Sequence, residues 1–405
     1  MSNETKDLEM PPTWGRRLLG LDGLRGFAAT SVLIHHVFQY LGDPDGSGAI
    51  YSVGALLTHG LTLFFVLSGF LLFRPFASAI LVGSRPPSLA RYFRNRGFRI
   101  FPAYVVILFV AWVLGVAVTG HSGDGSIALG RTDALTSIAD LTMLQTLFPP
   151  TVLTGISVAW SLTTELTFYL LLPVLFLAAR WLIRSGVNRL VAVVAPAAVL
   201  AVISYVAKAV VGIAKSGLSP EQAYDFSWGA TWTAVLDRSI LVQGDLFAYG
   251  MVAAIVVTFL QGRGLTRTAT GARILLAGSA LVLIGFAVVV SSVYSTSLVG
   301  AGAAAIVLVT VLPDANGRSS NLLARVLEFN PLWYLGLISY SMYLWHTPVI
   351  WWIRERGLYE DSPIGVLISC TVVLVVTVAL STITYFAVER PALRLKSPRK
   401  YPQPA

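Results

Sequence analysis

Long apolar runs recur from one end of this 405-residue sequence to the other, and they decide what the chain can fold into. Each run holds roughly 17–25 residues, the length that an α-helix needs to cross a bilayer. Hydrophobic residues make up 55% of the chain and charged residues only 12%, whereas soluble domains are about 25% charged. The sequence therefore predicts an all-α, polytopic membrane helix bundle.

Hydropathy predicts about ten transmembrane helices. They lie near residues 26–41, 53–73, 100–118, 158–180, 190–213, 240–260, 274–294, 298–312, 331–353 and 363–387. The stretch 136–157 is interrupted by Pro149, Pro150 and Gly155, so we expect a re-entrant or surface segment there. We find no internal repeat, although inverted repeats are typical of many transporters.

The basic residues indicate how the chain lies in the membrane. Most of the 29 Lys and Arg residues fall on one side when both termini are placed in the cytoplasm, as the positive-inside rule requires. We therefore expect a cytoplasmic tail at 1–20, a transmembrane domain at 21–390 and a second cytoplasmic tail at 391–405. Topology accounts for the net charge of +9 without a basic patch, so we expect no nucleic-acid partner.

Ionisable residues inside apolar spans cost about 2.5–3.5 kcal/mol each and mark candidate functional sites. Arg25 and His36 are eleven residues apart, which on a helix is roughly 16 Å and nearly the same face. The pair suits a substrate with an anionic part at the cytoplasmic surface and a reactive group deeper in the membrane. His35 lies about 100° around the helix from His36. An arginine that anchors the helix end and a histidine that only packs are the alternative interpretation.

Two arginines precede the third span on the predicted cytoplasmic side. Arg96 and Arg99 are three residues apart and share a helix face, where their planar donors match phosphate oxygens. Membrane topology alone also explains a basic cluster at this position.

Glu165 and His346 are the polar residues of two other spans. Glu165 lies one and a half turns below Trp160, which marks the outer interface, and suits a proton acceptor, a hydroxyl-binding group or a helix-locking salt bridge. His346 precedes Pro348, so its imidazole is also explained as a bridge to backbone groups that the proline frees. Ser339 and Tyr343, beside it, are typical of helix–helix contacts.

Motifs for other chemistries are missing from the sequence. The five histidines show no H-E-x-x-H pattern and no other close metal spacing, so we expect no metal site. There is also no G-x-S-x-G elbow, P-loop or G-x-G-x-x-G motif.

Seven stretches follow one another along most of the chain: LDGLRGFAATSVLIHH, LFFVLSGFLL, RNRGFRIFPAY, WSLTTELTFYLLLP, GDLFAYGMVAA, ISYSMYLWHTPV and YFAVERPALRL. In this order they resemble the acyltransferase-3 family of membrane-bound O-acyltransferases. The resemblance departs at Leu166, where the family often has a second acidic residue. It departs again at residues 243–245, which read Gln-Gly-Asp in place of the family's R-x-D.

The resemblance implies site residues. The family's catalytic signature is an arginine followed by ten residues and a histidine, which selects Arg25 and His36 over His35. Its R-x-x-R pair falls on Arg96 and Arg99, and its W-S-L-x-x-E glutamate on Glu165. Further candidates for acceptor binding or structure are Asp22, Trp160, Ser161, Ser339, Tyr343 and His346.

Family members move an acyl group, usually acetyl, from cytoplasmic acyl-CoA to a hydroxyl of a sugar or lipid on the other side. On this resemblance the arginines hold the donor, His36 is the general base, and Glu165 orients His36 or binds the acceptor. Acetyl-CoA is then a substrate, with no permanently bound cofactor. We expect a bacterial plasma-membrane enzyme acting on a cell-envelope glycan or glycolipid. A route through an acyl-histidine stays open, and the oxyanion donors are not identified.

A transporter or flippase of glycolipids is the alternative function, with the same arginines binding headgroups and Glu165 and His36 relaying protons. Loss of His36 separates the two functions, since it blocks ester transfer but need not block lipid movement. The sequence identifies neither the acceptor nor the oligomeric state.

Overall fold

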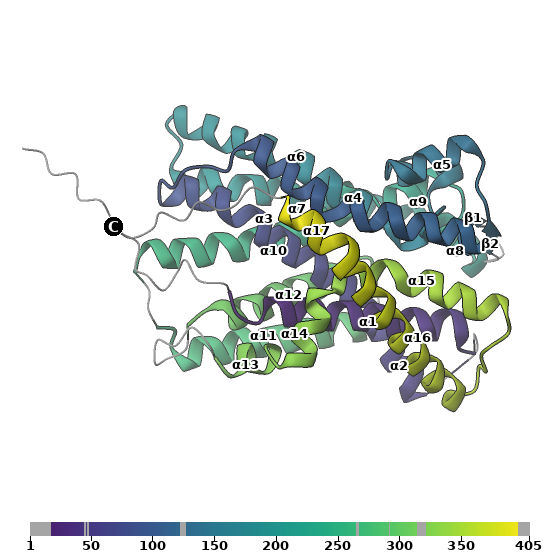
Figure 1. The fold of residues 1–405 in the computed structure, drawn as a ribbon. Helices are drawn as coiled ribbons and strands as arrows, with labels where there is room; N and C mark the ends of the chain where they lie inside the picture. The colour runs from purple at the N-terminus through teal and green to yellow at the C-terminus, as the bar shows by residue number, and fades with distance from the viewer. Residues whose placement is uncertain are drawn as a thin grey trace, which may run out of the picture.

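The computed structural model describes residues 18–395 except 44, 45, 47, 122–126, 265, 266, 291 and 314–320. Of the two expected cytoplasmic tails, 1–20 and 391–405, the structure describes only residues 18–20 and 391–395. Within the described residues the chain is a bundle of helices with one small hairpin (Figure 1). The predicted all-α fold class is confirmed.

Ten helices of 17 residues or more form the body of the bundle. They are α1 (Leu21–Leu41), α3 (Gly60–Leu81), α4 (Leu89–Leu114), α6 (Trp160–Arg184), α7 (Arg189–Lys215), α10 (Ile240–Gly262), α11 (Thr270–Val289), α12 (Ser295–Val311), α15 (Ser339–Glu355) and α16 (Pro363–Thr384).

Seven helical segments of the described chain are long and apolar enough to cross a membrane, and α12 is a shorter apolar helix. α1 and α15 fall outside this set. α15 has only 17 residues, and α1 carries Asp22, Arg25 and two adjacent histidines. The two long helices that are neither spanning by this criterion nor short and apolar are therefore the ones that hold His36 and His346.

Short elements connect the long helices. The helices are α2 (Ala49–Leu56), α5 (Ala134–Leu141), α8 (Pro220–Trp228), α9 (Trp232–Asp237), α13 (Leu322–Leu327), α14 (Asn330–Leu337) and α17 (Arg390–Arg394). Single 3-10 turns lie at Leu57–His59, Gln145–Leu147, Pro149–Thr151 and Ser157–Ala159, and a π-helical turn lies at Tyr385–Glu389.

The structure redraws the ends of three predicted spans. The second, 53–73, lies within a longer helical segment, Ile50–Leu81, in which a 3-10 turn at Leu57–His59 joins α2 to α3. The third, 100–118, begins at Leu89, so that the arginine-rich connector is itself helical, and it ends at Leu114. The ninth, 331–353, is broken at Ile338 into α14 and α15. Hydropathy misplaced the start of the third span because a helix continues for as long as its backbone bonds are made, whatever the polarity of its side chains.

A hairpin that the sequence analysis did not predict follows α4. Strand β1 (Ala117–His121) pairs antiparallel with β2 (Ile127–Gly130), with Val118 opposite Leu129. Residues 136–157 form α5 and 3-10 turns, not a spanning helix, as the prolines predicted. Helices α5, α8 and α9 and the hairpin gather at one end of the bundle (Figure 1).

The centre of the bundle is built from α3, α6 and α10. Phe247 of α10 stacks on Phe168 of α6, with ring centroids 4.3 Å apart, and lies 4.8 Å from Phe65 of α3. Gly69 and Gly250 let α3 and α10 touch, because a Cβ at either position would collide with a carbonyl oxygen of the other helix. Small residues permit such close backbone approach in membrane bundles. This rigid centre holds α3 and α6, which carry two walls of the site.

Candidate active site

A cavity of about 310 Å³ opens among α1, α3, α4, α6 and α15. Its polar lining residues are Arg25, Ser68, Arg96, Arg99, Ser161, Glu165, Tyr169, Ser339, Tyr340 and Tyr343. Seven of the eleven site residues predicted from the sequence line this cavity, although they come from segments far apart in the chain. The exceptions are Asp22, Trp160, His36 and His346.

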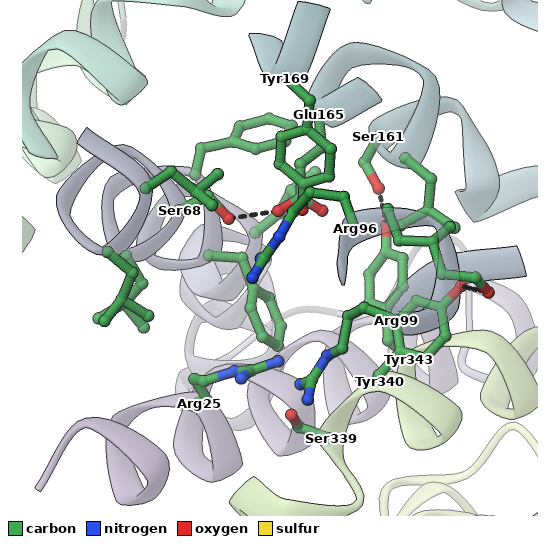
Figure 2. Close-up of a pocket in the computed structure, with 18 residues that line it drawn as sticks. Arg25, Ser68, Arg96, Arg99, Ser161, Glu165, Tyr169, Ser339, Tyr340 and Tyr343 are labelled. Atoms are coloured by element: carbon green, nitrogen blue, oxygen red, sulfur yellow. Dashed lines mark hydrogen bonds between the residues drawn. The ribbon is translucent and has the colours of Figure 1, made fainter. Parts of the chain in front are cut away.

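Three arginines converge on this cavity (Figure 2). Arg96 and Arg99 project from one face of α4, as their spacing predicted, and Arg25 reaches in from α1. The Arg96 guanidinium lies 5.8 Å from the centre of the Tyr169 ring. Arg25 is repelled by Arg99 and attracted by Asp22 and Glu165. Because like charges are costly to hold together in a partly buried cavity, the cluster favours an anionic ligand with several oxygens.

Glu165 is held on the opposite wall by a residue that the sequence analysis missed. Ser68 Oγ donates a hydrogen bond of 2.5 Å to Glu165 Oε1, which joins α3 to α6 (Figure 2). The signal was a lone serine in the quoted run LFFVLSGFLL, where a hydroxyl has little else to bond with. Glu165 thus places a carboxylate against a cluster of cations, not beside His36.

Tyr343 closes one end of the cavity. Its hydroxyl lies 2.7 Å from Ser161 Oγ and donates to the Val158 carbonyl at 2.9 Å, so it joins α15 to the start of α6. The neighbouring Tyr340 donates to the Ile100 carbonyl of α4 at 2.7 Å. The predicted helix–helix contact is confirmed for Tyr343, whereas the Ser339 hydroxyl donates locally, to the Gly336 carbonyl.

His36 lies beyond Tyr343 and does not line the cavity. The Tyr343 and His346 rings are 5.7 Å apart, and His346 Nε2 is 3.1 Å from His36 Nδ1. His36 Nδ1 is also 3.0 Å from the Val32 carbonyl oxygen. Arg25 and His36 therefore do serve two depths of one helix, but a layer of side chains separates them.

His346 has a role that the sequence analysis did not foresee. Its Nδ1 is 3.3 Å from the Met342 carbonyl oxygen and its Nε2 faces His36. Pro348 has no N–H, so the backbone group that it frees is the carbonyl of residue 344, four residues earlier. His346 contacts the Met342 carbonyl instead, so its interpretation as a bridge to a backbone group freed by Pro348 is wrong. His35 points elsewhere, with Nδ1 3.1 Å from the Gly54 carbonyl oxygen, so the geometry favours His36 of the two neighbours.

Glu389, an ionisable residue at the end of the last predicted span, lies close to the arginine cluster. It is 2% exposed, lies in the π-helical turn, and accepts a hydrogen bond from Ser341 through Oε1. Its Oε2 has no partner among the described residues, and its charge attracts Arg99 and Arg25. π-helical turns often occur at functional sites. The quoted stretch YFAVERPALRL contained this residue but not its contact with the arginine cluster.

A second cavity, of about 380 Å³, lies at the end of the bundle that holds α8 and α9. Trp160 and Trp228 line it together with Arg238, whose guanidinium lies 4.5 Å from the centre of the Trp228 ring. Arg238 also interacts electrostatically with Tyr40, and the Tyr40 ring stacks on His36 at 5.6 Å. Tyr40 therefore connects His36 to Arg238 in the lining of this second cavity.

Comparison with known proteins identifies the chain. The family model of an acyltransferase domain, acyltransferase-3, matches residues 18–386. The chain belongs to this family. It is accordingly an acyltransferase and a multi-pass membrane protein, and the family favours acyl transfer over the alternative of lipid transport.

Three relatives show the range of similarity. Nodulation protein 10 of Rhizobium leguminosarum bv. viciae is 28% identical over 93% of this chain and 93% of its own length. Acyltransferase MdmB of Streptomyces mycarofaciens is 27% identical over 96% and 95%. O-acetyltransferase OatA of Staphylococcus aureus is 24% identical over 93% of this chain but 57% of its own length. No solved structure matches the chain significantly.

Proposed function

We propose that this acyltransferase moves an acetyl group from cytoplasmic acetyl-CoA to a hydroxyl of a cell-envelope glycan or glycolipid. The observation that carries the proposal is one cavity with three converging arginines, and a histidine pair just beyond its Tyr343 wall. One relative is named an O-acetyltransferase, which supports acetyl as the group transferred.

The arginines suit the phosphates of the donor. Coenzyme A carries phosphate groups at one end and the thioester at the far end of a long arm. Arg96 and Arg99 offer forked donors that match phosphate oxygens in pairs, and Arg25 adds a third cation deeper along α1. The arm then extends toward Tyr343, and its thioester meets His36 once Tyr343 moves off Ser161.

His36 serves as general base on the acceptor hydroxyl. Its Nε2 takes the hydroxyl proton while the oxygen attacks the thioester carbonyl carbon and forms the new C–O bond. The C–S bond then breaks, and the CoA thiolate leaves with the proton returned by the imidazolium. Glu165, held by Ser68, balances the arginine charges when the donor is absent.

The second cavity suits the acceptor. Its tryptophan rings lie beside charged and amide side chains, and ligand pockets are typically lined by aromatic side chains with a few polar groups that fix orientation. With the N-terminus in the cytoplasm, as positive-inside topology requires, this cavity faces away from the cytoplasm. We therefore place the enzyme in a bacterial plasma membrane, with the donor and the acceptor entering from opposite sides.

Transfer of radiolabelled acetyl tests the proposal. Detergent-purified protein, acetyl-CoA labelled in the acetyl group and an extract of envelope glycolipids and polysaccharides are expected to give alkali-labile label in the extract. His36→Ala abolishes this label, whereas His35→Ala, on the same turn, leaves it. Equal labelling by wild type and His36→Ala would refute the assigned base. No label in any hydroxyl-bearing fraction, with lipid still crossing the bilayer, would refute acetyl transfer.

A further inference from the structure

Three carbonyl and imidazole contacts determine where the protons of the histidine pair lie. Val32 O is 3.0 Å from His36 Nδ1, and Met342 O is 3.3 Å from His346 Nδ1. A carbonyl oxygen only accepts, so each of these two Nδ1 atoms carries a hydrogen. His346 Nε2 is then a bare acceptor in the neutral ring, 3.1 Å from the Nδ1–H of His36.

We propose that His346 is the positioning residue of the transfer site. Together with the Val32 carbonyl it accepts the His36 Nδ1 hydrogen, which leaves His36 Nε2 free of a proton for the acceptor hydroxyl. The inference rests on the proposed function, since it takes His36 as the base. It adds the residue that selects the tautomer, a role that the sequence analysis had offered to Glu165.

The opposite arrangement of protons is unfavourable at two points. If His346 Nε2 donated to His36 Nδ1, the lone pair of His36 Nδ1 would face Val32 O. The lone pair of His346 Nδ1 would face Met342 O in the same way. Both are acceptor–acceptor contacts in a site where His346 is 0% exposed, and an unmet acceptor in such a place costs about 1–3 kcal/mol.

Burial gives His346 the rigidity that an orienting group needs. Its ring is packed against Tyr343 at 5.7 Å and against His36 at 5.0 Å. His36 is half-buried, and its Nε2 has no hydrogen bond to any described residue. A base nitrogen left open beside a nitrogen held by a third group is the arrangement that nucleophile–base–orienter sites share. When His36 gains a proton, His346 Nε2 keeps accepting from Nδ1–H and so stabilises the imidazolium.

The tautomer itself is measurable. In detergent-purified protein labelled with ¹⁵N-histidine, ring nitrogen shifts assigned by loss of the His36 signals in His36→Ala are expected to show one Nδ1–H tautomer. In His346→Ala the fraction of the Nε2–H form is expected to rise measurably, because the Nδ1–H form then keeps only the Val32 carbonyl as acceptor. His346→Gln is expected to keep the Nδ1–H form, since the amide oxygen accepts the same hydrogen. A wild-type His36 in the Nε2–H form overturns the inference.

Acetyl transfer gives the second readout, with thermal melting to show that each variant is folded. His346→Ala is expected to lower the turnover number by about 100-fold, within the range for a positioned general base, and His346→Gln to recover most of it. His35→Ala is the matched control and keeps the wild-type rate. A folded His346→Ala with wild-type rate and tautomer overturns the positioning role and leaves His36 as base. If His36→Ala itself transfers acetyl normally, the proposed function fails instead.

Discussion

Replacing the two arginines of α4 is expected to weaken donor binding by a predictable amount. Arg96 and Arg99 both line the cavity, half-buried, with no carboxylate within salt-bridge distance among the described residues. A hydrogen bond to a charged group contributes about 1.5–3 kcal/mol, so Arg99→Ala costs at least one such bond. Since about 1.4 kcal/mol is tenfold in affinity, the Kd for acetyl-CoA is expected to rise by about 10- to 150-fold.

Substitutions of Arg99 give a graded series of affinities, and Arg94 on the same helix provides a control. Arg99→Lys keeps the charge but loses the planar fork, so its Kd is expected to lie between those of wild type and Arg99→Ala. Arg94 is on the same helix but is exposed and does not line the cavity. Arg94→Ala therefore tests whether a cation on the exposed surface of α4 is enough to bind acetyl-CoA. Arg96→Ala/Arg99→Ala is expected to bind more weakly than either single variant, though not by the full product, because neighbouring sites are not additive.

Isothermal titration of acetyl-CoA into detergent-purified protein measures these affinities directly. The measurement is repeated at two salt concentrations, because contacts inside a cavity are screened less than surface contacts. Wild-type affinity in the folded double variant would refute the donor site on α4. Equal weakening by Arg94→Ala would refute the cavity as the place of binding and leave only surface attraction.

Three further predictions concern buried charges. Lys208 Nζ is 2.7 Å from Asp245 Oδ2, and the two side chains are 3% and 0% exposed. Lys208→Met leaves the buried carboxylate without its cation and is expected to destabilise the fold by about 3–5 kcal/mol in thermal melting. Adding Asp245→Leu is expected to restore most of this stability, and no restoration would refute the interpretation of the two residues as a buried ion pair. Burial raises the pKa of Asp140 to about 7, above its value in the unfolded chain, so the wild-type fold is most stable at low pH and loses stability as the pH rises toward and through 7. The melting temperature of Asp140→Asn minus that of wild type is therefore expected to increase from pH 5 to pH 8. A difference that stays constant over this range would contradict the prediction. Glu389→Gln removes a negative charge that attracts Arg99, so acetyl-CoA is expected to bind at least about threefold tighter by titration, and weaker binding would show that the carboxylate instead holds the arginine in place.

Some site residues could be found from the sequence because their signal is local. Arg96 and Arg99 share a helix face at any position in the bundle, so a spacing of three was enough to pair them. Glu165 stood out because a carboxylate in an apolar run is costly. In the structure all three line one cavity. The all-α class followed in the same way, since a lipid-exposed backbone must bond within its own helix.

The fine structure of the helices was harder to predict. The helical connector before Arg96 continues one helix through a change of hydropathy, whereas the break at Ile338 interrupts the backbone of a predicted span. The β1–β2 hairpin depends on contacts such as the bridge between Val118 and Gly155, which are distant in sequence. Local hydropathy carries no information about such pairings.

The sequence by itself determined a membrane helix bundle, its family and most of the residues on the cavity wall. Only the tertiary structure decided that His36 lies outside that cavity and bonds to His346, 310 residues away. It likewise decided that Ser68 holds Glu165. The physical reason is that hydropathy and helical periodicity act within one helix. Which turns of two helices meet depends on the packing of the whole bundle and on hydrogen bonds between helices.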